Sequence, residues 1–101
     1  MLDLNTLKNK YLTIKLLDGR EIELRKPNDE LYLKIEEFQN VDLNNSKEVL
    51  EETTKLTIDI LNRNKQKEVF TELDEEYDLS IRTAIIKEYI AFTKDIDENP
   101  N

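Results

Sequence analysis

Residues 10–25 read KYLTIKLLDGREIELR, and this stretch decides the fold because it predicts a tight β-hairpin. Apolar and polar residues alternate on both sides of a central Asp-Gly pair, which is typical of two strands that each have one apolar face. Two strands alone are marginally stable in water, so we expect helices to cover the apolar face. That face carries Leu12, Ile14 and Leu16 on the first strand and Ile22 and Leu24 on the second. The opposite face carries Tyr11, Thr13, Lys15, Glu21, Glu23 and Arg25.

The connection between the two strands can be predicted from the register of the apolar residues. A two-residue turn at the Asp-Gly pair would place Ile14 opposite Glu23, and the two apolar faces would then disagree. A three-residue loop over residues 17–19 places Ile14 opposite Ile22 instead. This loop needs a left-handed residue at its last position, where the only glycine of the chain, Gly19, stands. The register therefore predicts the three-residue loop.

Four helices are predicted after the hairpin, because apolar residues recur at spacings of three and four positions. They cover about 29–39, 46–62, 67–73 and 79–94, and residues 95–101 are predicted to fray. Residues 1–9 are compatible with either a helical turn or an extended arm. The pattern indicates an α+β, mostly helical fold with an N-terminal hairpin packed on about four helices. Residues 1–101 are expected to form a single domain.

Residues that can cap a helix precede three of the predicted helices. Asn28 stands just before the first of these helices, and acidic residues follow it in the first turn, where the helix dipole favours negative charge. Asn45 with Glu48 resembles a capping box. The last helix can be capped by Asp78 or by Ser80.

The composition excludes several classes of function. The chain has 23 acidic and 15 basic residues, and its net charge of -8 repels nucleic-acid phosphates and anionic lipid headgroups. It has no cysteine and no histidine, which excludes disulfides, the usual zinc and iron–sulfur sites and catalytic triads built on histidine. No apolar run approaches the ~20 residues that span a bilayer. We therefore expect a cytoplasmic, non-enzymatic protein without cofactor or metal that binds neither nucleic acid nor membrane.

Carboxylates are the only abundant groups that could support metal binding. The acidic run over residues 74–78 could bind Mg²⁺ or Ca²⁺, but a solvated loop before a helix is the favoured interpretation. Residues 95–99 imitate the start of a calcium-binding loop, yet Pro100 stands where that loop needs glycine. The basic stretch over residues 63–67 is interpreted as the end of a helix, where the dipole favours cations, rather than as a phosphate site.

The aromatic residues divide into core and surface candidates. Tyr89, Phe38 and Phe92 are predicted to lie in the core because they share faces with other apolar residues. Tyr11 lies on the outer face of the hairpin and Tyr32 on the wet side of the first helix, where an amphipathic ring can anchor a protein interface. An isolated, semi-exposed tyrosine is the competing interpretation for both. Tyr11 and Tyr32 are therefore the candidate partner-contact residues, and no residue is assigned a catalytic, cofactor-binding or metal-binding role.

Three stretches of the chain, in this order, resemble one known family. They are LTIKLLDGREIELRKPN (12–28), DELYLKIEEF (29–38) and, after a second amphipathic helix, EYDLSIRTAIIKEYIAFTKDI (76–96). The chain resembles the tail assembly chaperones of long-tailed phages and prophages of Gram-positive bacteria, which are small, acidic and mostly helical. The resemblance is one of pattern over most of the chain, and no short motif carries it. It transfers no site residue.

The resemblance implies a function without catalysis. Such chaperones coat the long, helical tape-measure protein before the tail tube polymerises around it, and they recruit tail-tube subunits. The implied partners are therefore tape-measure and tail-tube proteins, met in the cytoplasm of the host cell, with the chaperone working in many copies. Many members of the family are made in two forms, the longer through a ribosomal frameshift.

Two other classes of function compete with the chaperone. A small acidic cytosolic regulator or adaptor, antitoxin-like or inhibitor-like, with a basic protein partner suits the size and charge of the chain equally well. An enzyme that uses carboxylates and a divalent metal is the second rival, and titration with Mg²⁺, Mn²⁺ and Ca²⁺ would detect it. The genes that flank the coding sequence separate a chaperone from a regulator.

Overall fold

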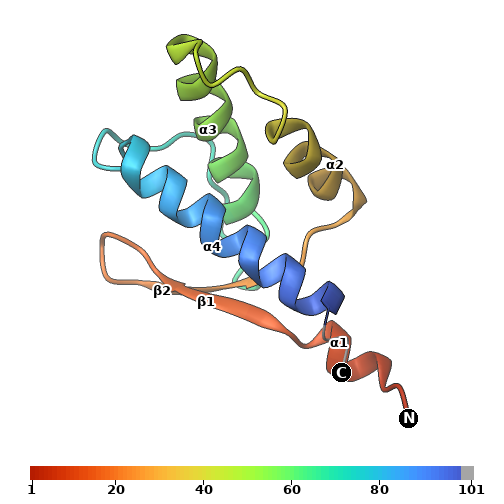
Figure 1. Cartoon of the computed structure of the whole chain (residues 1–101). Coiled ribbons are helices and arrows are strands. Elements are labelled where there is room, and N and C mark those ends of the chain that lie inside the picture. The colour runs from red at the N-terminus through yellow and green to blue at the C-terminus, as the bar shows by residue number, and fades with distance from the viewer. Residues whose placement is uncertain (99–101) are drawn as a thin grey trace.

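Two strands and four helices make up the part of the chain that the computed structural model describes, residues 1–98 (Figure 1). The expected α+β fold, an N-terminal hairpin with about four helices, is confirmed. The segment before the hairpin takes the helical alternative, as a short helix. In chain order the elements are α1 (Leu4–Lys8), β1 (Tyr11–Lys15), β2 (Glu21–Arg25), α2 (Asp29–Phe38), α3 (Ser46–Leu61) and α4 (Leu79–Glu98).

The hairpin has the predicted register and the predicted loop. Ile14 lies opposite Ile22 in the antiparallel pair of β1 and β2. The N–H of Leu16 donates to the carbonyl oxygen of Arg20 at 2.8 Å, and the N–H of Gly19 donates to the carbonyl oxygen of Leu16 at 2.9 Å. Gly19 has φ of +92°, the left-handed conformation that the loop requires. The three-residue loop is therefore confirmed.

The outer edge of β2 is covered by the chain that follows α3. Leu24 and Asn64 form an isolated antiparallel bridge. The N–H of Arg25 donates to the carbonyl oxygen of Arg63 at 2.9 Å, and the N–H of Lys65 donates to the carbonyl oxygen of Glu23 at 2.8 Å. Residues 63–65 thus pair with β2 through one isolated bridge, which supports a hairpin that would be marginal by itself.

The helix predicted over residues 67–73 is wrong, because two asparagine side chains hold this stretch in an irregular conformation. Asn62 exchanges two hydrogen bonds with the backbone of Phe70, at 2.7 and 2.9 Å. Asn64, only 1% exposed, does the same with the backbone of Glu68, at 2.8 Å each. Lys67 has a positive φ of 62°, which a right-handed helix does not allow. The backbone groups that a helix would use are therefore bonded elsewhere.

The other three predicted helices begin at the predicted residues but end at different ones. Helices α2 and α3 each end one residue earlier than predicted, at Phe38 and Leu61. Helix α4 continues to Glu98, four residues beyond its predicted end. The fraying of residues 95–101 stays a prediction, and residues 99–101 lie outside the described residues.

Three side chains cap the helices as their sequence positions suggested. Asn28 Oδ1 accepts from the N–H of Leu31 at 2.9 Å, and Asn45 Oδ1 accepts from the N–H of Glu48 at 3.1 Å. Of the two candidates for α4, Asp78 is the cap, since its Oδ1 accepts from the N–H of Ile81 at 3.0 Å. The reciprocal half of the capping box does not form, because the N–H of Asn45 donates to the carbonyl oxygen of Asp42.

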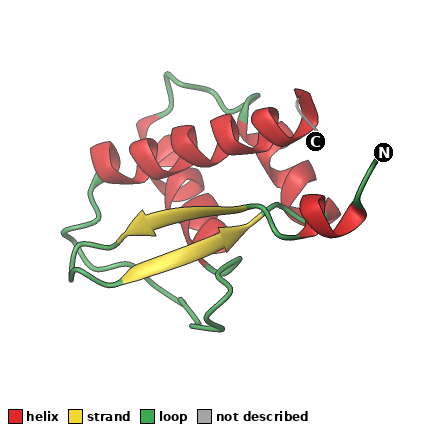
Figure 2. Ribbon diagram, turned by 90° about the horizontal axis from the view of Figure 1, so that it is seen from below, coloured by secondary structure: helices red, strands yellow, loops and turns green. Residues whose placement is uncertain are grey.

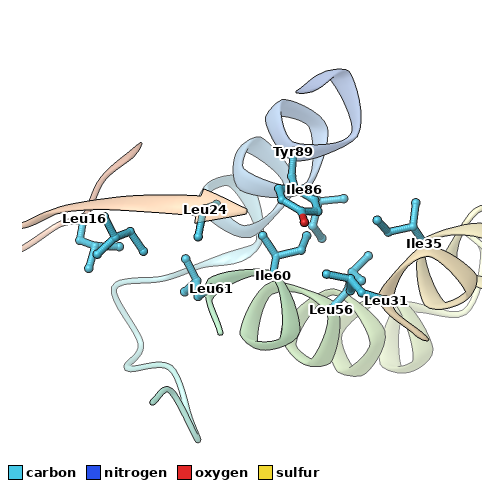
Figure 3. Packing of buried hydrophobic residues seen from close by; sticks show 10 residues of the cluster. Leu16, Leu24, Leu31, Ile35, Leu56, Ile60, Leu61, Ile86 and Tyr89 are labelled. Atoms are coloured by element: carbon cyan, nitrogen blue, oxygen red, sulfur yellow. The ribbon is translucent and has the colours of Figure 1, made fainter. Parts of the chain in front are cut away.

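The hairpin lies on one side of the helices, and α4 runs alongside it (Figure 2). Helix α4 packs against α3, and α3 packs against α2, which stands beside it (Figure 1). Side chains from the hairpin, α2, α3 and α4 meet in one cluster. Within it, Tyr89 and Ile86 point from α4 toward Ile60 of α3 (Figure 3). Tyr89 is therefore core, as predicted, and Phe38 and Phe92 pack on its margin. The cluster consists of Leu16, Ile22, Leu24, Leu31, Ile35, Leu56, Ile60, Leu61, Ile86 and Tyr89.

Candidate functional site

A groove of about 710 Å³ lies in the surface between α2 and α3. These two helices stand side by side and are joined by the loop over residues 39–45 (Figure 1). The amphipathic pattern of α2 turns Leu31 and Ile35 into the core, which leaves its neighbouring face to form one wall of the groove. The lining residues are Lys34, Glu37, Phe38, Asn40, Val41, Glu48, Glu52, Lys55, Leu56, Ile58, Asp59 and Thr71.

The apolar part of the groove comes from both walls. Phe38 and Val41 contribute from the end of α2 and the loop after it, and both side chains are half-buried. Leu56 of α3 is buried, and Ile58 is half-buried. Phe38, Val41 and Ile58 remain partly exposed to water, so a partner that covers them gains hydrophobic free energy.

Two lysines in the groove are already paired with carboxylates. Lys34 Nζ lies 3.1 Å from Asp59 Oδ2 and 3.6 Å from Glu30 Oε1, so that it links α2 to α3. The hydrogen bond with Asp59 raises the pKa of Lys34 above its ordinary value and keeps the ammonium charged. Lys55 Nζ lies 3.8 Å from Glu52 Oε1. These cations are therefore neutralised within the groove.

Two carboxylates of the groove are left without such a partner. Glu37 on α2 and Glu48 on α3 line the groove, and neither forms an ion pair with any residue in the range 1–98. One stands on each wall. The groove therefore combines an apolar surface with uncompensated negative charge on both sides, which favours a partner that is apolar and basic.

This groove is not among the sites predicted from the sequence, although the sequence contains one signal for it. Glu48, Glu52, Lys55 and Asp59 recur at i, i+4, i+7 and i+11, a spacing that places four charged residues along one edge of α3. That signal predicts a charged helix face. It does not predict that α2 stands beside the face, because the packing of two helices depends on residues far apart in the chain.

The two tyrosines predicted as partner contacts lie elsewhere. Tyr11 is half-buried on the outer face of the hairpin, and the ammonium of Lys65 lies 4.9 Å from the centre of its ring. Tyr32 lies on α2 and is 42% exposed. The structure does not bring them together with the groove, since neither lines it. Tyr11 and Tyr32 stay candidate contacts on separate surfaces.

The charged runs singled out in the sequence have local structural roles. Asp74 Oδ1 accepts from the N–H of Glu76 at 2.9 Å, which closes a turn in the acidic loop. Among the side chains that the structure describes, those of residues 1–95, no three acidic groups gather in a way that could hold a metal ion. In the basic stretch, the guanidinium of Arg63 donates to the carbonyl oxygen of Lys26 through two nitrogens, at 2.9 and 3.2 Å.

Comparison of the chain with models of protein families, with characterised proteins and with solved structures finds no match. Over the described range, no helix is both long enough and apolar enough to cross a membrane.

Proposed function

We propose that this protein is a non-enzymatic tail assembly chaperone, which binds the tape-measure protein and recruits tail-tube subunits during phage tail morphogenesis. The observation that carries the proposal is the groove between α2 and α3, with apolar surface from Phe38, Val41 and Ile58. A tape-measure protein exposes long apolar stripes until the tube covers them. A chaperone for such a client must offer an apolar groove that a helical ridge can enter.

The charge of the chain supports the same proposal. A net charge of -8 on 101 residues keeps a protein apart from its own copies when many of them line one client. Charged side chains such as Glu37 and Glu48 border the apolar surface of the groove. They keep the exposed apolar area small, which limits self-association of the free protein. The proposed place of action is the cytoplasm of the host cell.

A small acidic regulator or adaptor with a basic partner is the second candidate. The observation that favours it is the pair of carboxylates, Glu37 and Glu48, that lack a counter-ion on opposite walls of the groove. A basic toxin or enzyme could supply the missing charge. In this candidate the groove would bind one folded partner rather than successive segments of a long helix.

Co-purification from the native host tests the two candidates against each other. The protein is tagged in its host, any prophage is induced, and the proteins that co-purify are identified by mass spectrometry. Recovery of a long helical protein together with a tube-forming subunit supports the chaperone and names both clients. Recovery of one small basic protein, or of a host enzyme, contradicts the chaperone and supports the regulator.

A further inference from the structure

We infer that the groove between α2 and α3 binds a single amphipathic helix whose apolar stripe is flanked on both sides by lysine or arginine. This inference rests on the proposed function and goes further, because it states the chemistry of the client segment. Three features of the groove support it: the kind of walls it has, its length and the placement of its free charges.

The walls favour a helix over an extended peptide. An extended peptide gains affinity by pairing its backbone with the open edge of a sheet. Most of the lining belongs to α2 and α3, and the N–H and C=O groups within a helix already bond to one another. The other lining residues are Asn40 and Val41 in the loop between the helices and Thr71 after α3, and none of them belongs to a strand. An occupant must therefore satisfy its own backbone, and a helix does so while presenting side chains to the apolar surface.

The length of the groove sets the length of the occupant. Along α3 the lining extends from Glu48 to Asp59, and with a rise of 1.5 Å per residue this span is about 16 Å. A helix that lies along the groove therefore engages it over about three turns. Such a helix presents apolar residues at i, i+3 or i+4, and i+7 toward Phe38, Val41 and Ile58.

The free charges set the sign of the flanks. Lys34 and Lys55 are paired with carboxylates inside the groove, whereas Glu37 and Glu48 have no counter-ion within the described chain. Because Glu37 belongs to α2 and Glu48 to α3, a helix between them meets a carboxylate on each side. Lysine or arginine beside the apolar stripe then gains a partner on both walls, and an acidic flank is repelled.

Two synthetic helical peptides of about 14 residues test the inference on the complete chain. Both carry the same stripe of leucines, which lysines flank in one peptide and glutamates in the other. Binding is measured by fluorescence anisotropy at low and high salt. We expect the lysine-flanked peptide to bind, more weakly at high salt, and the glutamate-flanked peptide to bind much less. Equal binding of the two peptides, or of neither, overturns the inference.

Paired substitutions locate the attraction. Glu37→Gln combined with Glu48→Gln should raise the dissociation constant of the lysine-flanked peptide roughly two- to tenfold. Glu36→Gln combined with Glu51→Gln changes the net charge equally on the same two helices but outside the groove, and it should leave the constant unchanged. Equal weakening by both pairs would assign the attraction to overall charge and overturn the groove as the site.

A blocking substitution tests the apolar surface. Val41→Arg fills the groove and adds a cation, and it should abolish binding, whereas Leu33→Arg, on an exposed part of α2 outside the groove, should not. Circular dichroism establishes that both variants are folded.

Peptide binding with no phage proteins in the host co-purification supports the groove and contradicts the chaperone. Recovery of phage proteins without peptide binding contradicts the groove alone.

Discussion

The hydroxyl of Tyr89 on α4 donates a hydrogen bond of 2.7 Å to the carbonyl oxygen of Arg25, the last residue of β2. The Tyr89 side chain has no exposed surface, and its burial raises the pKa of the phenol well above the ordinary value. The phenol therefore stays neutral and keeps its donor proton. This bond joins the last helix to the hairpin. Tyr89 itself lies in the core cluster (Figure 3).

Replacing Tyr89 by phenylalanine should destabilise the protein. Tyr89→Phe leaves the ring in place and deprives the Arg25 carbonyl of this donor, which should lower the free energy of unfolding by about 1–2 kcal/mol. Urea denaturation measures the change. Tyr77→Phe is the matched control, because the Tyr77 hydroxyl only accepts from the N–H of Leu17 at 3.3 Å in an exposed turn. Equal losses in the two variants would contradict a special role for the buried bond.

Replacing Gly19 by valine should destabilise the hairpin through backbone strain. Gly19 has φ of +92°, and a Cβ atom at this position would have no atom within 4 Å, so the expected penalty comes from the backbone conformation. Because a β-branched residue resists positive φ, Gly19→Val should cost about 1–3 kcal/mol. Gly19→Asn, which tolerates this conformation better, should cost less. An unchanged urea midpoint in Gly19→Val would show that the loop assignment is wrong.

Removing the Asn64 side chain should release the segment that follows α3. The side chain donates to the carbonyl oxygens of Leu61 and Glu68 and accepts from the N–H of Glu68, each at 2.8 Å. Asn64→Ala leaves these groups without that partner in a buried place, which should cost about 1–3 kcal/mol.

Hydrogen exchange measures the local effect of that substitution. The N–H of Lys65 bonds to β2 and the N–H of Glu68 to Asn64, so both should exchange faster in Asn64→Ala. Amides in the middle of α4 serve as the internal control, because their exchange rates should change only with the global stability of the protein. Unchanged exchange at Lys65 and Glu68 would show that backbone contacts alone hold the segment.

The cap of α4 should make stability depend on pH in the acid range. The N–H of Ile81 and the hydroxyl of Ser80 both donate to the carboxyl of Asp78. These bonds, the one from Ile81 most of all, lower the pKa of that carboxyl below its ordinary value. A lowered folded pKa means that the stabilisation is complete above pH about 4 and is lost as the pH falls through the folded pKa. Asp78→Asn keeps an acceptor but has no charge to lose.

The wild-type chain should therefore be more stable than Asp78→Asn at neutral pH, and the difference should shrink below pH about 4. Thermal unfolding followed by circular dichroism across this range measures both curves. Glu75→Gln, in the exposed acidic loop before the helix, controls for loss of one negative charge. A difference between wild type and Asp78→Asn that persists unchanged into acid would contradict the ionised cap.

Features that depend on a few neighbouring residues could be predicted from the sequence. The loop at Gly19, the register of Ile14 against Ile22 and the caps at Asn45 and Asp78 all follow from residues within a few positions of one another. The error over residues 67–73 has a different origin. Apolar residues there do reach the core, as Phe70 shows, but the side chains of Asn62 and Asn64 bond to the backbone of this segment. The residues just before the segment bond to β2, which lies far away in the sequence.

The sequence by itself determined the hairpin, the starts of three helices, the core position of Tyr89 and the acidic, histidine-free chemistry of the chain. It could do so because propensity, capping and alternation are local properties. Only the tertiary structure decided that residues 63–65 pair with the edge of β2 and that α2 and α3 line a groove with Glu37 and Glu48 on different helices. Both depend on contacts between segments distant in the chain, which packing of the core selects and no local pattern encodes.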